Sequence, residues 1–314
     1  MSSTPRVETI TLGDELLLGI RENAHLTYLG NQLAHHGLEA AANLVIKDDP
    51  EEIRLFFAES WERSDVVITT GGLGPTSDDL TRETIAKFLG EELIFDESVE
   101  KHIKERFSLL GRTMPEINLR QCYRPESAEI LANPYGTAPG LFIKKDGKIL
   151  VMLPGPAREM HPMFEEQVVP RLQEAGIFPE IDCYLQLRTA GIGESDLAEK
   201  VGHLLEGKEG LIVGYCAHAG MVDLRLSSLD GEVLSQEQLT QIGEACCEAI
   251  GEDFVCFGDR TIAEVIFREL RTLGKTLAVA ESCTGGLLSS SFTEIDGISK
   301  VFHGGAVCYH NDAK

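Results

Sequence analysis

The sequence predicts an α/β protein of two or three domains, in which short apolar strands alternate with amphipathic helices. Its 314 residues exceed one typical domain, and 43% of them are hydrophobic, which is ample for proper cores. Up to residue 70 the expected order is strand, helix, strand, helix, strand. Such alternation is typical of a parallel sheet with helices on both faces.

The elements before residue 70 follow from the spacing of apolar residues. They are strands at 6–12, 38–46 and 65–69, and helices at 23–37 and from Pro50. The first strand ends at a turn rich in glycine and acid, Gly-Asp-Glu-Leu-Leu-Leu-Gly at 13–19. In the helix after it, Leu26, Leu29 and Leu33 share one face. Pro50 suits a first helical turn, where its missing N–H costs nothing.

The central stretch of the first segment is Thr-Thr-Gly-Gly-Leu-Gly-Pro-Thr-Ser-Asp-Asp-Leu-Thr-Arg-Glu at 69–83. It lies between the strand at 65–69 and a helix expected at 80–89, at the strand end where open α/β sheets bind ligands. Its glycines allow close approach to a ligand and turn backbone N–H groups toward an anion. They are Gly71, Gly72 and Gly74.

Asp78 and Asp79 place two carboxylates at the start of that helix. Carboxylates are good ligands for Mg²⁺, which usually sits between carboxylates and phosphate oxygens. The alternative is ordinary structure, since glycine-rich turns are common and an Asp at a helix start is often only a cap. The combination of three glycines, a proline and two aspartates favours a phosphate-and-metal site.

Two further glycine-bearing junctions follow in the same segment. A short strand at 92–95 and a helix at 96–110 lead to the loop Asn-Pro-Tyr-Gly-Thr-Ala-Pro-Gly at 133–140. A hairpin across Asp146 and Gly147 is expected next, and its second strand ends in Leu-Pro-Gly-Pro at 153–156. Each junction alone is most simply an ordinary turn between a strand and the next element. Together with the turn at 13–19, however, the junctions favour a single ligand-binding site at one edge of the sheet.

The pattern changes at 171–182, and an α+β segment follows. It is expected to contain strands at 185–189, 211–215, 222–226 and 254–257, and helices up to Leu205 and at 235–250. Ser195 is the expected N-cap of the first of these helices. The segment shows no clustered catalytic set, so it reads as a connector or dimerisation module.

A third unit begins near Arg260, with a helix through Leu273 and strands at 277–280 and 305–309. Between the strands, Glu-Ser-Cys-Thr-Gly-Gly at 281–286 forms another strand-to-helix junction. There a hydroxyl and a thiol would gain from the positive helix N-terminus, which can stabilise an oxyanion. The simpler interpretation is an N-cap by Ser282 or Thr284. No histidine lies beside Ser282, so the local sequence does not support a Ser-His-Asp triad.

The formal net charge of −23 limits the partners of the protein. So acidic a surface repels nucleic acids and anionic membranes, and an anionic small substrate would need a metal ion or a nest of N–H groups. The sequence has no run of about 18 apolar residues and no signal-peptide core. Its eight cysteines form no Cys-x-x-Cys pair. We therefore expect a cytoplasmic protein with reduced thiols.

Taken together, these motifs resemble the CinA family, the competence/damage-inducible protein A group. The resemblance implies that residues 1–172 form a three-layer α/β/α domain similar to the molybdopterin-binding domain of MoaB and MogA proteins. It also implies a KH-type linking domain at 173–258 and the first part of a nicotinamide mononucleotide deamidase domain at 259–314. That last domain normally continues further in the family, so it is expected to be incomplete here. A homodimer is implied as well.

The family's first domain is associated with ADP-ribose pyrophosphatase activity that depends on a divalent metal. The resemblance therefore implies hydrolysis of a nucleotide substrate with Mg²⁺ or another divalent metal. Deamidation at Ser282 and pterin or nucleotide binding without catalysis are the alternatives. One departure is Asp14, where the family usually has Thr, which adds charge at the expected pocket.

The candidate site residues carry three roles. The catalytic candidates in the first domain are Asp78, Asp79 and Glu83, and the resemblance implies Ser282, Tyr309 and Lys314 as those of the third. The expected metal ligands are Asp14, Asp78 and Asp79. The expected substrate-binding residues are Gly13, Glu15, Gly71, Gly72, Gly74, Thr76, Asn133, Gly136, Thr137 and Gly155. Asp14, Glu15 and Glu83 all remain open as a further ligand or base.

Overall fold

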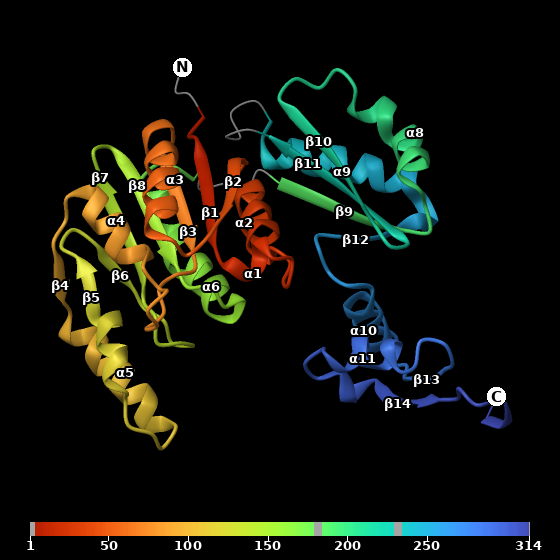
Figure 1. Ribbon diagram of the computed structural model, residues 1–314. Coiled ribbons are helices and arrows are strands. Elements are labelled where there is room, and N and C mark those ends of the chain that lie inside the picture. Colours follow the sequence, from red (N-terminus) through yellow and green to blue (C-terminus); the bar gives the residue numbers. More distant parts are fainter. Residues whose placement is uncertain (1–3, 179–183, 229–233, 314) are drawn as a thin grey trace. The chain divides into compact units, whose positions relative to one another are not determined.

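The computed structural model describes residues 4–178, 184–228 and 234–313, and its elements are labelled in Figure 1. The chain divides into two compact units, residues 1–183 with 228–233 and residues 184–227 with 234–314. None of the helices in the described residues is both long and apolar enough to cross a membrane.

The first unit is built on a six-stranded sheet with the order β2-β1-β3-β8-β7-β6. Its strands are β1 (Val7–Leu12), β2 (Ala40–Ile46), β3 (Val66–Thr70), β6 (Glu129–Leu131), β7 (Gly140–Lys145) and β8 (Lys148–Leu153). The four strands β2, β1, β3 and β8 run parallel, whereas β7 pairs antiparallel with β8 and β6. The hairpin expected across Asp146 and Gly147 is confirmed. The sheet is therefore mixed rather than wholly parallel, because this tight turn reverses the chain.

Helices cover both faces of this sheet, which confirms the three-layer α/β/α arrangement (Figure 1). They are α2 (Ala24–His35), α3 (Pro50–Arg63), α4 (Thr81–Leu89), α6 (Ala157–Met163), a π-helical turn (Phe164–Val168) and α7 (Val169–Glu174). Leu29 of α2 packs in one core with Ile68 of β3. Phe57 of α3 packs in the other core with Val67, the next residue along β3. Successive residues of β3 thus face opposite cores, as the pleat requires.

Smaller elements surround the sheet. They are α1 (Asp14–Leu17), β4 (Leu93–Phe95), α5 (Glu97–Leu109), a 3₁₀ helix (Glu116–Cys122) and β5 (Tyr123–Pro125). The expected strand at 92–95 exists, but it pairs with β5 in a separate two-stranded sheet. Helix starts follow local chemistry: Asn23 Oδ1 accepts from Leu26 N at 3.2 Å, and Asp49 Oδ1 accepts from Glu51 N and Glu52 N.

The second unit opens with a four-stranded antiparallel sheet in the order β10-β11-β9-β12. Its elements are β9 (Tyr184–Ala190), α8 (Glu194–Leu205), β10 (Leu211–His218), β11 (Met221–Ser228), α9 (Gln236–Ile250), a 3₁₀ turn (Gly251–Asp253) and β12 (Phe254–Phe257). This chain order and strand order make the split β-α-β arrangement. The predicted N-cap Ser195 is wrong: α8 already begins at Glu194, so Gly193 holds the cap position.

The rest of the second unit contains a parallel strand pair and two helices. They are α10 (Ile262–Leu273), β13 (Leu277–Glu281), α11 (Leu287–Thr293), β14 (Phe302–Val307) and 3₁₀ turns at Ile298–Lys300 and Asn311–Ala313. Thr261 caps α10 through a reciprocal pair of hydrogen bonds with Glu264. The strand expected at 305–309 instead spans Phe302–Val307, since its pairing with β13 ends where Val307 lies opposite Glu281.

Candidate functional site at the strand ends

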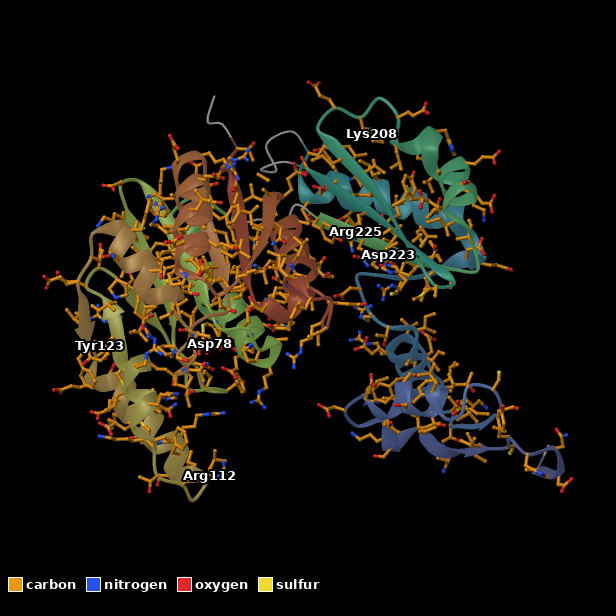
Figure 2. The ribbon with its side chains drawn as sticks, viewed as in Figure 1. Asp78, Arg112, Tyr123, Lys208, Asp223 and Arg225 are labelled. Atoms are coloured by element: carbon orange, nitrogen blue, oxygen red, sulfur yellow. The ribbon has the colours of Figure 1, made fainter. Side chains whose placement is uncertain are left out.

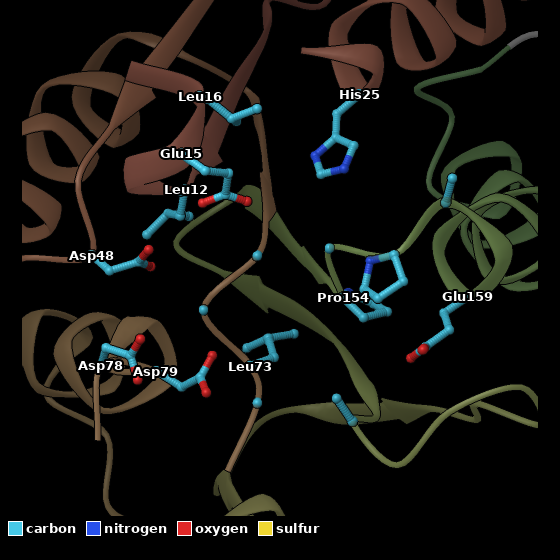
Figure 3. A pocket seen from close by; sticks show the side chains of 18 of the residues that line it. Leu12, Glu15, Leu16, His25, Asp48, Leu73, Asp78, Asp79, Pro154 and Glu159 are labelled. Atoms are coloured by element: carbon cyan, nitrogen blue, oxygen red, sulfur yellow. The ribbon is translucent and has the colours of Figure 1, made fainter. Parts of the chain in front are cut away.

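A cleft of about 620 Å³ opens at the carboxyl ends of β1, β3 and β8, where the loops after these strands meet (Figure 3). This is the sheet edge at which open α/β folds bind ligands. The predicted residues that line it are Gly13, Glu15, Gly71, Gly72, Gly74, Asp78, Asp79, Thr137 and Gly155. The predicted residues outside the lining are Asp14, Thr76, Glu83, Asn133 and Gly136.

The glycine loop after β3 forms one side of the cleft. Gly71 N donates to Leu153 O at 3.0 Å, which ties the loop to the end of β8. Gly72 has a φ of +64°, and a Cβ there would lie 1.9 Å from Thr81 Oγ1, so any larger residue would be strained and would force Thr81 to shift. In the described part of the chain, the N–H groups of Gly72, Leu73 and Gly74 have no acceptor. They remain available to an anionic ligand.

Asp79 is positioned by its own loop. Its Oδ2 accepts from Thr76 N at 2.9 Å and from Thr76 Oγ1 at 2.5 Å. The hydroxyl of Thr76 also lowers the pKa of Asp78. Helix α4 begins only at Thr81, with Leu80 at the cap position and no side-chain cap. The simple interpretation of the two aspartates as helix caps is therefore wrong, because both precede the helix in the loop that lines the cleft.

Glu83 acts outside the cleft. It forms ion pairs with Arg82 at 2.9 Å and with Arg120 at 3.3 Å. Arg120 in turn donates to the carbonyl oxygens of Thr76 and Asp79. Arg120, paired with Glu83, thus holds the backbone of the 75–79 segment in place. Thr76 holds Asp79 within that segment.

Asp48, which was not predicted, lines the cleft beside these aspartates. Partial burial and the charges of neighbouring carboxylates raise the pKa of Asp48 to about 6. Those carboxylates are Asp14, Asp79, Asp78 and Glu15. The Asp48 Oδ1 atom is buried and has no hydrogen-bond partner among the described residues. The available signal was its place two residues after β2, at the same edge of the sheet.

His25 also lines the cleft and was not predicted. Its Nδ1 lies 2.9 Å from Thr70 Oγ1, at the end of β3. Burial lowers the pKa of His25, against the effects of the Gly155 backbone and of Glu15. Figure 3 shows its ring across the cleft from Asp48 and Asp79. A neutral imidazole at this position ties α2 to the strand end without adding positive charge.

The 133–140 loop supports the cleft indirectly. Asn133 Nδ2 donates to Ala138 O at 2.7 Å and to Glu159 Oε2 at 2.8 Å. Thr137 and Glu159 line the cleft, while Asn133 lies buried behind them. Glu159 was not among the predicted residues, although its segment was.

The junction after β13 in the second unit is closed by its own carboxylate. Glu281, only 4% exposed, accepts from the N–H groups of Gly286, Leu288 and Ser289. It also accepts from Ser289 Oγ at 2.5 Å, and these bonds lower the pKa of Glu281 to about 2. These three N–H groups are therefore not available to an oxyanion, because Glu281 already occupies them. Ser282 and Thr284 do not cap α11 either.

The other predicted residues of this unit differ in exposure. Ser282 is half-buried and Tyr309 is 70% exposed. Lys314 lies outside the described residues. Across the described chain, no three His, Cys, Asp or Glu side chains are gathered closely enough to hold a metal ion by themselves.

Three family models match the chain. They are a probable molybdopterin binding domain over residues 8–174, the damage-inducible protein CinA KH domain over 186–255 and the CinA C-terminal domain over 259–314. Among solved structures, the CinA protein of unknown function from Thermoplasma acidophilum is 35% identical, with a TM-score of 0.50. That match covers 53% of this chain and 98% of the other.

Full-length relatives match across all these segments. A CinA-like protein from Kosmotoga olearia is 39% identical over 313 residues, 98% of this chain and 75% of its own. A putative competence-damage inducible protein from Caldanaerobacter subterraneus is 40% identical over 309 residues, 98% of this chain and 74% of its own.

Proposed function

Because this chain belongs to the CinA family, we propose that its first domain hydrolyses the pyrophosphate bond of ADP-ribose or a related nucleoside diphosphate with a divalent metal ion. The observation that carries the proposal is the pairing of two features in one cleft. The glycine loop, whose N–H groups at Gly72, Leu73 and Gly74 lack an acceptor among the described residues, lines the same cleft as Asp48 and Asp79 from two separate loops. The first feature suits phosphate oxygens, and the second suits a cation that neutralises them.

The donor set fits Mg²⁺ or a similar ion. Asp48 has a buried oxygen with no partner among the residues that the structure describes, and burial and neighbouring carboxylates raise its pKa to about 6. A bound cation would relieve both costs. Mg²⁺ usually takes only one or two carboxylates together with waters and substrate phosphates, so it does not need an all-protein cage. Asp48, Asp78 and Asp79 are the residues that would hold it, and Asp14 remains a proposed outer contributor.

When bound, such an ion would polarise the phosphate oxygens and lower the pKa of a water molecule. The chain's own groups have separate tasks. The N–H groups of Gly72 and Gly74 would donate to the charge that develops on phosphate. Thr76 fixes the orientation of Asp79 through two hydrogen bonds, so this carboxylate is held ready before substrate enters. Leu73 and Pro154 supply apolar walls (Figure 3).

The test is an assay of AMP release from ADP-ribose, with Mg²⁺ or Mn²⁺ and with chelator. We expect metal-dependent turnover that Asp79→Asn lowers by about 100-fold or more, as removal of a charged active-site group does. Asp146→Asn is the matched control, because this aspartate lies in the hairpin turn with a φ of 52°, which Asn also adopts readily. Full activity of Asp79→Asn would refute the assignment. Ligand binding without turnover in the wild type would support a pterin- or nucleotide-binding module instead.

A second candidate is nicotinamide mononucleotide deamidation at Ser282. It is supported by the match of residues 259–314 to the CinA C-terminal domain. Release of ammonia from nicotinamide mononucleotide, abolished by Ser282→Ala, would establish it. The occupation of nearby N–H groups by Glu281 means that an oxyanion would need other donors.

A further inference from the structure

Glu159 is a nearly buried carboxylate that lines the cleft but does not belong to the glycine loop. It lies in α6, is 8% exposed and lines the cleft. Figure 3 shows it across the cavity from Asp48, Asp78 and Asp79, with Pro154 beside it. Glu159 thus lies on the opposite side of the cleft from these three aspartates.

The position of Glu159 is built by the 133–140 loop. Asn133 Nδ2 donates to Glu159 Oε2 at 2.8 Å, and Asn133 Oδ1 accepts from Tyr135 N at 3.1 Å. A Cβ at Gly136 would lie 1.8 Å from Glu159 Oε2, so this glycine leaves room for the carboxylate. His102 of α5 bonds the carbonyl of Asn133 at 2.8 Å and anchors the loop. The carboxylate is therefore held in one orientation.

The second oxygen of Glu159 has no hydrogen-bond donor among the described residues. Arg158 Nε lies 3.9 Å from Oε1, and the Arg158 side chain is 78% exposed, so this pair contributes little. Because Glu159 lines the cleft, its Oε1 atom keeps contact with solvent there, and a ligand donor can replace that water. A donor from a ligand in the cleft would satisfy Oε1.

A hydroxyl group is the donor that fits this position best. Asn133 already occupies Oε2, and the proposed nucleotide substrate offers ribose hydroxyls that can donate to Oε1. An acid in a nucleotide site accepts a hydrogen bond from a ribose hydroxyl and repels a phosphate attached there. We propose that Glu159, positioned by Asn133, recognises a ribose hydroxyl of the nucleotide and excludes nucleotides that carry a phosphate on it. This inference rests on the proposed nucleotide substrate.

Binding of matched ligand pairs tests the proposal. The first pair is ADP and 2′-deoxy-ADP, which reports on the adenosine ribose, and the second is ribose 5-phosphate and 2-deoxyribose 5-phosphate, which reports on a terminal ribose. With Mg²⁺ present, calorimetry on the wild type should show the hydroxyl form of one pair binding about 10- to 100-fold more tightly, as expected for a hydrogen bond to a buried charge. The pair that responds identifies the ribose.

Glu159→Gln should reduce that ratio to about 3 or less, because a neutral amide bonds the hydroxyl more weakly. Glu166→Gln, an exposed acid in the following π-helical turn, is the matched control and should leave the ratio unchanged. Glu159→Ala, checked for folding by circular dichroism, separates lost recognition from lost structure. It should abolish the preference while the deoxy ligand still binds.

Three outcomes would overturn the proposal. The wild type could show no preference within either pair, or Glu159→Gln could weaken both members equally, which indicates a purely structural role. In both cases hydrolysis of ADP-ribose by the wild type would leave the proposed function intact. If the wild type neither binds nor hydrolyses ADP-ribose, the proposed function fails, and this inference fails with it.

Discussion

Two strand-to-helix junctions of this chain share a glycine-rich sequence pattern, but they differ in whether their backbone N–H groups are available to a ligand. One follows β3 with Gly71 and Gly72, and the other follows β13 with Gly285 and Gly286. Both come after a strand of a parallel pair, and both carry acids nearby. In the first, the N–H groups of Gly72, Leu73 and Gly74 have no partner among the described residues, and these residues line a cleft. In the second, Glu281 occupies the N–H groups at the start of α11.

The position of the acid explains this difference. Glu281 is the last residue of its strand, so its side chain reaches forward over the turn and bonds the helix start. In the first junction the acids come after the glycines, and Thr76 and Arg120 hold the 75–79 segment open. Figure 2 shows Asp78 in the first unit, in the side-chain view of the whole chain. An acid before the turn closes the site, and an acid after it leaves the site available.

The largest expected effect is the loss of stability when the left-handed glycine of each junction is replaced by alanine. Gly72 and Gly285 have similar φ values, +64° and +58°, but a Cβ at Gly72 would meet Thr81 Oγ1 at 1.9 Å, while nothing lies within 4 Å of one at Gly285. Gly72→Ala should therefore cost about 3 kcal/mol of stability and abolish hydrolysis, because strain and overpacking add. Gly285→Ala should cost about 1 kcal/mol from backbone strain alone.

Urea unfolding measures this pair of variants. Trp61, the single tryptophan, is buried in the first unit and reports its unfolding by fluorescence. Far-UV circular dichroism follows both units, so the part of its transition that Trp61 fluorescence does not show reports the second unit. Equal losses in the free energy of unfolding for Gly72→Ala and Gly285→Ala would show that the close contact with Thr81 does not distinguish the two junctions.

The next effect is a change of stability with pH that has opposite signs for Asp48, in the cleft beside the first junction, and for Glu281, in the second junction. Asp48 has a folded pKa of about 6, above its usual 3.8, so the folded state binds the extra proton and stability falls as pH rises from about 4 to 6. Glu281 has a folded pKa of about 2, below its usual 4.5, so its contribution is lost as pH falls from 4.5 toward 2.

Asp48→Asn isolates the first of these trends. Without metal, the variant should gain about 1 to 2 kcal/mol over the wild type at pH 7.5, allowing for solvent screening, and little at pH 4. Trp61 fluorescence in urea at both pH values gives the difference. Millimolar Mg²⁺ should stabilise the wild type more than the variant. An identical pH dependence of the two proteins would argue against crowding of carboxylates at Asp48.

The sequence predicts the fold well and the site only in part, for a physical reason. Asp78, Asp79 and the glycine loop lie in one continuous segment, so their pattern is visible locally. Asp48 and His25 come from other segments, and they reach the cleft only because the strand order β2-β1-β3-β8 brings those loops together. Ser195 failed as a cap because backbone position, not residue type, decided where α8 begins. Glu281 blocks the N–H groups at the start of α11 because of the direction of its side chain, and the spacing of residues in the sequence does not predict that direction.

Removal of the Glu281 carboxylate should open the second junction. Glu281→Ala frees the N–H groups of Leu288 and Ser289, so their amide hydrogens should exchange several-fold faster by hydrogen–deuterium exchange. Exchange in the first unit should stay the same. Glu294→Ala, an exposed acid just after α11, is the control. Unchanged exchange in Glu281→Ala would mean that the carboxylate does not hold this helix start.

The smallest expected effect is that of removing one of the two hydroxyls that bond the carboxylates of Asp79 and Glu281. Thr76 Oγ1 lies 2.5 Å from Asp79 Oδ2, and Ser289 Oγ lies 2.5 Å from Glu281 Oε1. Thr76→Val keeps the side-chain shape and removes one bond, while the Thr76 N–H still holds Asp79. We expect hydrolysis of ADP-ribose to fall about 5- to 10-fold, equivalent to about 1 kcal/mol for one hydrogen bond. Ser289→Ala should instead leave hydrolysis unchanged and speed amide exchange only in α11. A loss of hydrolysis in Ser289→Ala would contradict the separation of the two junctions, because it would make the closed one part of the reaction.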